Sequence, residues 1–324
     1  MVGLNNATVS TSMFILRGFS GMEEYRIWIS FPFCCIYIIT VIANSSICFI
    51  IKQNASFHLP MYVLLSMLLV TGLVASNTIL PKMLCLLLFN SKDISFEACL
   101  IQMFLVVAFC VMAFGVLVAM AFDRYTAICN PLRYTTILTN QFIIKIALTL
   151  ISKGVLLALP LPFIFLRLPF CRSRTIEHTY CEHLTVAKLA CADITINIVY
   201  GLAGSLLVAG FDFLAIVLSY IMIARAVFKL HFKESRKKAV STCSTHLCFT
   251  VIAFVPIFLN VITNRFSTRV PAQVQILFSN LLVILPPLLN PIIFGINTKQ
   301  IWEKIYQILN PTCLIGNIIP KHNR

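Results

Sequence analysis

The sequence predicts an all-α membrane protein in which seven helices cross the bilayer as one bundle. Of its 324 residues, 59% are hydrophobic and only 11% are charged, and the mean hydropathy is +0.93. So few charged residues do not coat a soluble globule. Each bilayer span needs about 20 apolar residues, and seven runs qualify. The runs cover residues 27–51, 61–80, 99–127, 143–165, 194–223, 239–262 and 274–294.

The charges between these runs predict how the bundle is oriented. The loop after the fifth run carries one acidic residue, Glu234, and the tail adds Lys299 and Lys304. An excess of Lys and Arg marks the cytoplasmic side of a membrane, so the N-terminus lies outside. The net charge of +14 then reflects topology, and we expect membrane lipids and no nucleic acid as partners. The basic residues of the loop are Arg225, Lys229, Lys233, Arg236, Lys237 and Lys238.

Three regions follow from this topology. Residues 1–26 form an extracellular N-terminus, residues 27–294 the seven-span domain, and residues 295–324 a cytoplasmic tail. The N-terminus lacks the pattern of a cleavable signal peptide, so the first span serves as the targeting signal. Asn6 begins an Asn-Ala-Thr sequon on the outer side, and we expect it to be glycosylated.

The tail contains one further predicted helix. Between residues 298 and 309, Ile301, Trp302 and Ile305 recur with helical spacing among polar residues. A short helix with one apolar face lies along a membrane surface. We therefore expect an amphipathic helix on the inner leaflet.

The third run ends in a charged pair. Residues 120–134 read Met-Ala-Phe-Asp-Arg-Tyr-Thr-Ala-Ile-Cys-Asn-Pro-Leu-Arg-Tyr, which places Asp123 beside Arg124 at the membrane edge. Ionisable residues within a span are costly, so such a pair is a candidate functional site. The fifteen-residue string resembles the odorant (olfactory) receptors among the rhodopsin-like G-protein-coupled receptors.

Other strings carry the same resemblance. Residues 57–62 read Phe-His-Leu-Pro-Met-Tyr, residues 238–247 read Lys-Ala-Val-Ser-Thr-Cys-Ser-Thr-His-Leu, and Asn290-Pro291 is followed by Phe294. The segment His-Thr-Tyr-Cys-Glu-His at residues 178–183 resembles the class I, or fish-like, branch. The resemblance implies a plasma-membrane receptor that is no enzyme, binds a small odorant and activates a heterotrimeric G protein of the stimulatory olfactory type.

The resemblance also implies which residues switch the receptor. In the resting state Asp123 holds Arg124, and in the active state Arg124 meets Tyr220 with His246 adjacent. His246 has a second interpretation as an ordinary helix-packing group. The coupling set that the resemblance implies is Asp123, Arg124, Tyr125, Tyr220, His246, Asn290 and Pro291.

Four cysteines fall on the predicted outer side, and sequence alone permits three pairings among them. They are Cys99, Cys171, Cys181 and Cys191. The resemblance implies the pairs Cys99–Cys181 and Cys171–Cys191. The first pair would pin the second exit loop over the bundle, and the second would shape that loop into a lid.

The register of the spans predicts an apolar ligand face with few polar groups, as small-molecule sites have. Arg265 is the fixed positive charge near its mouth, and it has two interpretations: a clamp for a carboxylate ligand, or an anchor at the membrane edge. Class I receptors often respond to carboxylic acids, so an acid is the first ligand class to consider. The predicted face comprises Val106, Val107, Cys110, Val111, Gly204, Ser205, Val208, Phe254, Ile257, Phe258, Val261, Arg265, Asn280 and Val283.

The chain departs from the family at three positions. Thr126 replaces the usual Val, and Gly72 and Ala113 stand where the family has acidic residues. Without those acids we expect no sodium site, and no other metal site or cofactor. Either the core is rebuilt on Asn44, Asn290 and Asp212, or the receptor signals poorly. Asp212 itself is either a structural hydrogen-bonding group or part of a conformational switch.

Other classes fit the sequence less well. A transporter would show internal repeats and interrupted helices, and an enzyme would need convergent titratable groups. Neither pattern is present in the sequence. A non-odorant rhodopsin-like receptor for a lipid or a peptide is the remaining alternative.

Overall fold

The computed structural model describes residues 13–19, 21–171, 174–229, 233–263, 270–297 and 299–309. Within these residues, seven helical segments are long and apolar enough to cross a membrane, which confirms the predicted bundle. The segments run Glu23–Gln53, Pro60–Phe89, Phe96–Cys129, Asn140–Leu166, Thr195–Phe228, Ala239–Val261 and Gln273–Gly295.

Within the described residues, the spans are built from nine α-helices and one π-helical turn. The first three are α1 (Arg26–Gln53), α2 (Pro60–Phe89) and α3 (Phe96–Cys129). The fourth and fifth spans are α5 (Asn140–Ala158) with α6 (Pro160–Leu166), and α8 (Thr195–Ser205) with a π-helical turn, η4 (Leu206–Gly210), and α9 (Phe211–Phe228). The last two are α10 (Lys233–Val261) and α11 (Ala272–Asn297).

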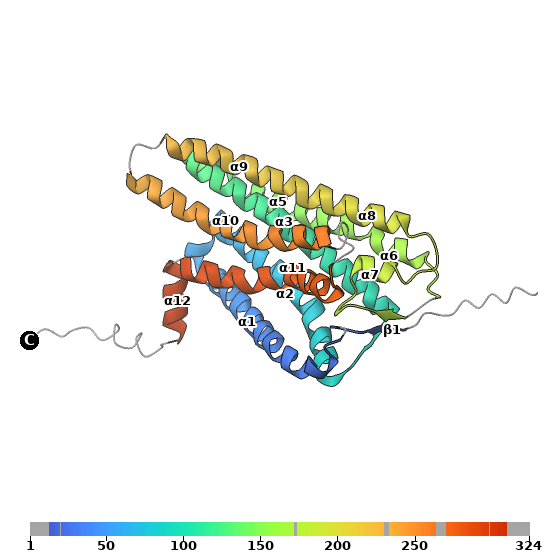
Figure 1. The fold of residues 1–324 in the computed structure, drawn as a ribbon. Coiled ribbons are helices and arrows are strands. Elements are labelled where there is room, and N and C mark those ends of the chain that lie inside the picture. Colours follow the sequence, from blue (N-terminus) through green and yellow to red (C-terminus); the bar gives the residue numbers. More distant parts are fainter. Residues whose placement is uncertain are drawn as a thin grey trace, which may run out of the picture.

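Short helices fill the connections. They are η1 (Glu23–Tyr25), η2 (Ala55–Phe57), η3 (Pro131–Arg133), α4 (Tyr134–Ile137) and α7 (His183–Ala187). The predicted amphipathic helix is α12 (Lys299–Leu309). Figure 1 shows the long helices side by side, with α7 and the strand β1 (Met13–Leu16) at one end of the bundle and α12 across the other.

The second span is longer than the predicted run of residues 61–80. Pro81 does not end α2, because a proline within a membrane helix is tolerated where neighbouring groups satisfy the backbone. Lys82 follows it, and its Nζ donates to the backbone oxygens of Ser91 and Asp93, at 3.0 and 2.6 Å. The ammonium group therefore reaches the loop beyond the helix, and α2 continues to Phe89.

A small sheet at one end of the bundle departs from the all-α prediction. Its strands are β1, β2 (Asp93–Ser95) and β3 (Thr175–Ile176), in the order β2-β1-β3. Strand β1 runs antiparallel to β2 and parallel to β3. Phe14 and Leu16 on alternate positions of β1 are fully buried, as one face of a strand requires. The sheet ties the N-terminal segment to the exit loop.

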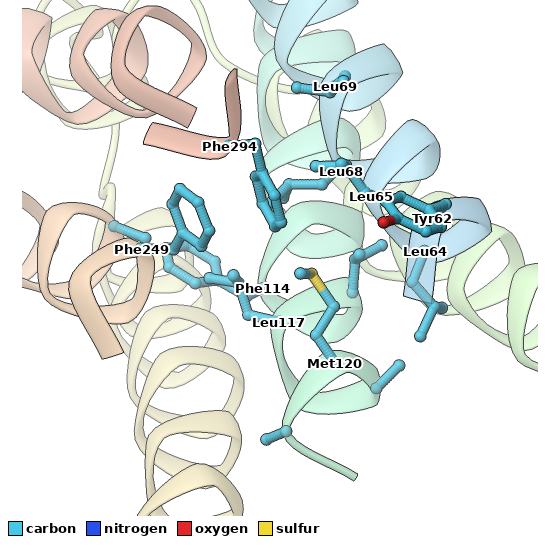
Figure 2. Close-up of a cluster of buried hydrophobic side chains, with 14 of the residues drawn as sticks. Tyr62, Leu64, Leu65, Leu68, Leu69, Phe114, Leu117, Met120, Phe249 and Phe294 are labelled. Carbon is cyan, nitrogen blue, oxygen red and sulfur yellow. The ribbon is translucent and has the colours of Figure 1, made fainter. Parts of the chain in front are cut away.

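The core lies around α3, which is the most buried of the seven spans. Figure 2 shows the apolar cluster that joins it to α2, α10 and α11, where the rings of Phe249 and Phe294 stack with centroids 4.3 Å apart. Large apolar side chains also point outward: Trp28 is 79% exposed and Phe211 73%. Such outward faces fit a hydrocarbon environment.

Candidate functional site

The second exit loop forms a lid over the outer end of the bundle. Disulfides join Cys99 to Cys181 and Cys171 to Cys191, which is the pairing that the resemblance implies. The backbone N–H of Cys181 also donates to Gln102 Oε1 at 2.9 Å. These bonds hold the middle of the loop against the start of α3.

The lid is also fastened to α11. Thr179 Oγ1 donates to Asn280 Oδ1 at 2.9 Å, and Tyr180 Oη donates to the backbone oxygen of Ser279 at 3.4 Å. Asn280 was expected on the ligand face, but it does not line the cavity described next. Its amide bonds the lid and the backbone of its own helix, so in this structure Asn280 anchors the lid, and its contact with a ligand stays a prediction.

Beneath the lid lies a cavity of about 210 Å³. Its wall combines α3, the turn region of α8 and η4, α10 and α11, and it is mostly apolar. Ten residues of the predicted ligand face line it, namely Val106, Val107, Cys110, Val111, Gly204, Ser205, Val208, Ile257, Val261 and Val283.

Two aromatic residues of the predicted face do not line the cavity. Phe254 is only 2% exposed and packs against Phe114, with ring centroids 4.8 Å apart. Phe258 is 38% exposed and meets the ring of Phe213 edge-on. In this structure the facing aromatic rings hold both side chains in the packing between helices, and their contact with a ligand stays a prediction. Arg265 lies outside the described residues.

The sequence analysis missed the polar groups that the lid supplies. Glu182 and His183 follow Cys181 and line the cavity together with Tyr180. The signal that could have found them is the Cys99–Cys181 pair, because a loop pinned at Cys181 places its next residues over the bundle. The helices add Tyr200 and Asn260 to the same lining.

His178 and Glu182 are titratable groups of the lid with shifted pKa values. Burial lowers the pKa of His178 to about 4, although the nearby Glu182 raises it. Burial raises the pKa of the Glu182 carboxyl, but His178 and hydrogen bonds from Thr185 lower it more. Thr185 donates from its backbone N–H and its hydroxyl to Glu182 Oε2, both at 2.7 Å. At neutral pH the lid therefore presents an ionised carboxylate and a neutral His178.

At the opposite end of α3, Arg124 is bound by its neighbour. Its Nε donates to Asp123 Oδ2 at 2.9 Å, and its Nη2 contacts the same oxygen. Asp123 is fully buried and also accepts a hydrogen bond from Tyr134 Oη at 2.8 Å. This is the arrangement expected of a resting state. Tyr134 is a partner that the sequence analysis did not foresee.

Tyr220 and His246 contact each other in this structure. Tyr220 Oη lies 2.7 Å from His246 Nδ1, and the two rings stack. His246 Nε2 lies 3.1 Å from the backbone oxygen of Leu117, so the ring also bridges α10 to α3. Tyr125 packs into a cluster at this end with Ile223 and its neighbours.

Asn290 and Pro291 lie in α11 beside a second, smaller cavity. This cavity has a volume of about 50 Å³, and its lining includes Gly72, Ala113 and Asn290 but no carboxylate. A Cβ on Gly72 would lie 3.1 Å from Pro287 Cβ, so α11 occupies the space that an acidic side chain would need. Among the described residues, no group of three His, Cys, Asp or Glu is placed to hold a metal ion.

Asp212 is paired within the membrane span. Lys153 Nζ donates to both of its carboxylate oxygens, at 2.8 and 2.9 Å. The rebuilt core of Asn44, Asn290 and Asp212 is therefore not formed: Asp212 joins α9 to α5, whereas Asn44 donates to the backbone oxygen of Pro287 at 2.8 Å. A carboxylate in a span needs a partner, and here Lys153 provides it.

Comparison with known proteins identifies the family. The family model described as olfactory receptor matches residues 33–311. Olfactory receptor 52N4 of Homo sapiens is 43% identical over 96% of this chain and 97% of its own length. The human olfactory receptors 52N2 and 52P1 are each 44% identical, over 95% and 94% of this chain and 97% and 95% of their own lengths.

These matches agree with the seven spans, the lid disulfides and the Asp123–Arg124 pair. They favour an odorant receptor over a lipid or peptide receptor and over an enzyme. The chain belongs to the olfactory receptor family, in its class I branch, and is a multi-pass G-protein-coupled receptor of the plasma membrane.

Proposed function

We propose that this receptor binds a small volatile ligand in the cavity beneath the lid and activates a stimulatory G protein of the olfactory type, which raises cAMP. The observation that carries this proposal is the cavity itself. It is roofed by a disulfide-bonded loop, mostly apolar, and edged by few polar groups. Small-molecule sites in proteins share this character.

Helix α3 would connect ligand binding to the conformational change at the coupling site. Val106, Val107 and Val111 line the cavity, and the same helix carries Arg124 at its other end. A ligand shifts a conformational equilibrium only by its differential affinity for the two states. When α10 swings outward, Tyr220 leaves His246, and Arg124 exchanges Asp123 for Tyr220. The opened groove receives the C-terminal helix of the G-protein α subunit.

The charged residues near the cavity suggest the class of ligand. A medium-chain carboxylic acid fits the apolar wall, and Arg265 would take its carboxylate in a forked hydrogen bond. Among the described residues, the cavity lining contains Glu182 and no Lys or Arg. An acid would therefore bind with its head group toward Arg265, away from Glu182, and with its chain against the valines of α3.

The charge assignment is tested with acids, alcohols and esters of one carbon skeleton in cells that report cAMP. Arg265→Ala should lower the potency of acids and leave alcohols unchanged. Glu182→Gln should raise the potency of acids by about tenfold, because about 1.4 kcal/mol of like-charge repulsion is removed. Unchanged acid potency in both variants would contradict the proposal that Arg265 binds a carboxylate. Alcohols and esters would then be the candidate ligands.

The cavity is tested by filling it. Gly204 lines the cavity, and a Cβ added there meets no atom within 4 Å. Gly204→Leu should lower ligand potency at normal surface expression, because the new side chain occupies the space of the ligand. Gly210→Leu is the matched control, since Gly210 is equally open but does not line the cavity. Equal potency in the two variants argues against this site.

The topology has a separate test. We propose that residues 1–26 lie outside, residues 27–294 form the membrane domain, and residues 295–324 lie in the cytoplasm. Asn6, outside the described residues, would then be glycosylated. Treatment with an N-glycosidase should increase the gel mobility of the wild-type protein and leave Asn6→Gln unchanged. A wild-type protein that the enzyme does not shift contradicts the use of Asn6.

A further inference from the structure

A third cavity, which shares no lining residue with the cavity beneath the lid, lies at the outer edge of the bundle. Its volume is about 180 Å³, and it is enclosed by the segment after β1, the beginning of α1 and the end of α2. Three cationic residues line it, Arg17, Arg26 and Lys92, against a single acidic residue, Glu23. The charge balance of this lining is therefore positive.

Two of these cations form no ion pair within the part of the chain that the structure describes. Arg17 is bonded to Glu177 at 2.8 Å, but among the described residues neither Arg26 nor Lys92 forms an ion pair. Arg26 Nη1 is buried and makes no hydrogen bond to any described residue. A buried charged nitrogen without a partner is unfavourable, and an anion would satisfy it.

Glu23 does not supply that partner. Its side chain is exposed to solvent, and within the described part of the chain it forms no ion pair with Arg26 or Lys92. This leaves Arg26 and Lys92 available at the cavity.

The remaining lining is apolar and lies beside the membrane surface. Ile29, Leu86 and Leu87 form part of the wall, and the two leucines are each 4% exposed. Nearby, Tyr25 at the end of η1 is 59% exposed and Trp28 in α1 is 79% exposed. Aromatic residues of this kind gather at the level of the lipid head groups. A ligand for this site thus carries both a negative head and an apolar part.

We propose that this cavity is a second extracellular binding site, for an oxyanion with an apolar substituent, held by Arg26 and Lys92. Two sources supply that chemistry: a phospholipid of the outer leaflet, and a free organic phosphate. Because Lys92 accepts a backbone hydrogen bond from Leu16 of β1 at 2.8 Å, an occupant braces the sheet that joins the N-terminus to the lid.

The test uses the full-length receptor purified in a maltoside detergent without phosphate. Its thermal unfolding midpoint is measured against the concentration of hexyl phosphate, and the phosphorus retained per protein is assayed. A ligand that binds only the folded state raises the midpoint. The variants are Arg26→Gln and Lys92→Gln. Lys188→Gln is the control, because it removes one exposed extracellular charge away from this cavity.

Hexyl phosphate should stabilise the wild type and Lys188→Gln, with a half-saturating concentration at least about tenfold higher in Arg26→Gln and Lys92→Gln, the equivalent of about 1.4 kcal/mol. If hexyl phosphate has no effect but the wild type retains phosphorus that both variants lose, a phospholipid occupies the site. Equal behaviour of all four proteins in both assays overturns the proposal. None of these readings depends on odorant or cAMP.

Discussion

His178 is a buried imidazole inside the lid, only 3% exposed, whose Nε2 has no hydrogen-bond partner in the described structure. Its ring packs edge-on against Tyr180, and its Nδ1 lies 3.4 Å from the backbone nitrogen of that residue. Such a site accepts the neutral ring and opposes the charged one, because a buried charge without a partner is unstable.

This burial predicts that acid weakens the lid. The pKa of His178 is about 4 in the folded protein, against an ordinary value of 6.5. The unfolded chain takes up its proton first, so stability is full above pH 6.5 and falls by about 3 kcal/mol as the pH decreases to 4. The thermal unfolding midpoint of the wild type should fall more between pH 6.5 and 4 than that of His178→Gln. If the unfolding midpoints of the two proteins change in parallel with pH, the destabilising role of His178 is contradicted.

At the scale of single residues, the sequence predicted partners that are neighbours in the chain or that the family motif contains. Asp123 with Arg124 and the cysteine pairs are of this kind. It could not predict that Phe254 packs on Phe114, because small rotations of α10 decide which side chain reaches the cavity. Helical register predicts which face of a helix a residue lies on, but not whether its side chain reaches a cavity a few ångströms away.

The ion pair of Lys153 and Asp212 belongs to the scale of elements. It fastens α5 to α9 directly after the π-helical turn η4, whose Val208 and Ala209 line the ligand cavity. A π-helical turn inserts one extra residue into a helix and is frequent at functional sites. The pair therefore fixes α9 just beyond the turn that shapes one wall of the cavity.

Replacing one partner of this ion pair should destabilise the folded receptor more than replacing both partners. Lys153→Met leaves the buried carboxylate of Asp212 unpaired and should destabilise the protein by about 3 kcal/mol, whereas Lys153→Met with Asp212→Leu should recover most of that loss. Thermal unfolding of the purified receptor measures both. Lys145→Met, on the exposed face of α5, should have little effect. Strictly additive losses in the double variant would show that the two side chains act independently.

The contact of α2 with α11 depends on Gly72. A Cβ at this position would lie 3.1 Å from Pro287 Cβ and 3.4 Å from its Cα. Asn44 also donates to the backbone oxygen of Pro287 and holds that turn in place. The two helices are thus packed for a glycine, and the acidic residue common in the family no longer fits.

Introducing the family's acidic residue at position 72 should therefore destabilise the folded receptor. Gly72→Ala should destabilise it by about 1–3 kcal/mol through overpacking, and Gly72→Asp by more, because it also buries a charge. Pro287→Gly should reduce the loss caused by Gly72→Ala, because it removes the Pro287 Cβ that the new methyl group would meet. Gly295→Ala serves as the control, since a Cβ there meets no atom within 4 Å. A Gly72→Asp receptor as stable as the wild type in thermal unfolding would refute the packing argument.

Long elements were predictable and short ones were not. Runs of about 20 apolar residues identify spans, because the bilayer thickness sets their length. Strands β1, β2 and β3 have four residues or fewer and pair across the chain, so no local pattern distinguishes them from loop. The Lys153–Asp212 pair joins residues 59 apart, and only the packing of α5 on α9 brings them together.

At the scale of the whole molecule, α3 connects the two ends of the receptor. It begins beside Cys99, which is bonded to the lid, and it carries Asp123 and Arg124 near its other end. Figure 1 shows the lid region and α12 at opposite ends of the bundle. The proposed ligand cavity and the proposed coupling residues are therefore separate in space, and we expect that a variant can remove one function without the other.

The most direct test measures ligand binding and cAMP production together in Arg124→Ala. The account predicts unchanged ligand affinity and no cAMP response, because the cavity lies at the far end of α3 while the coupling residue is lost. A variant that still raises cAMP at normal potency, or that loses ligand affinity at normal surface expression, would contradict it.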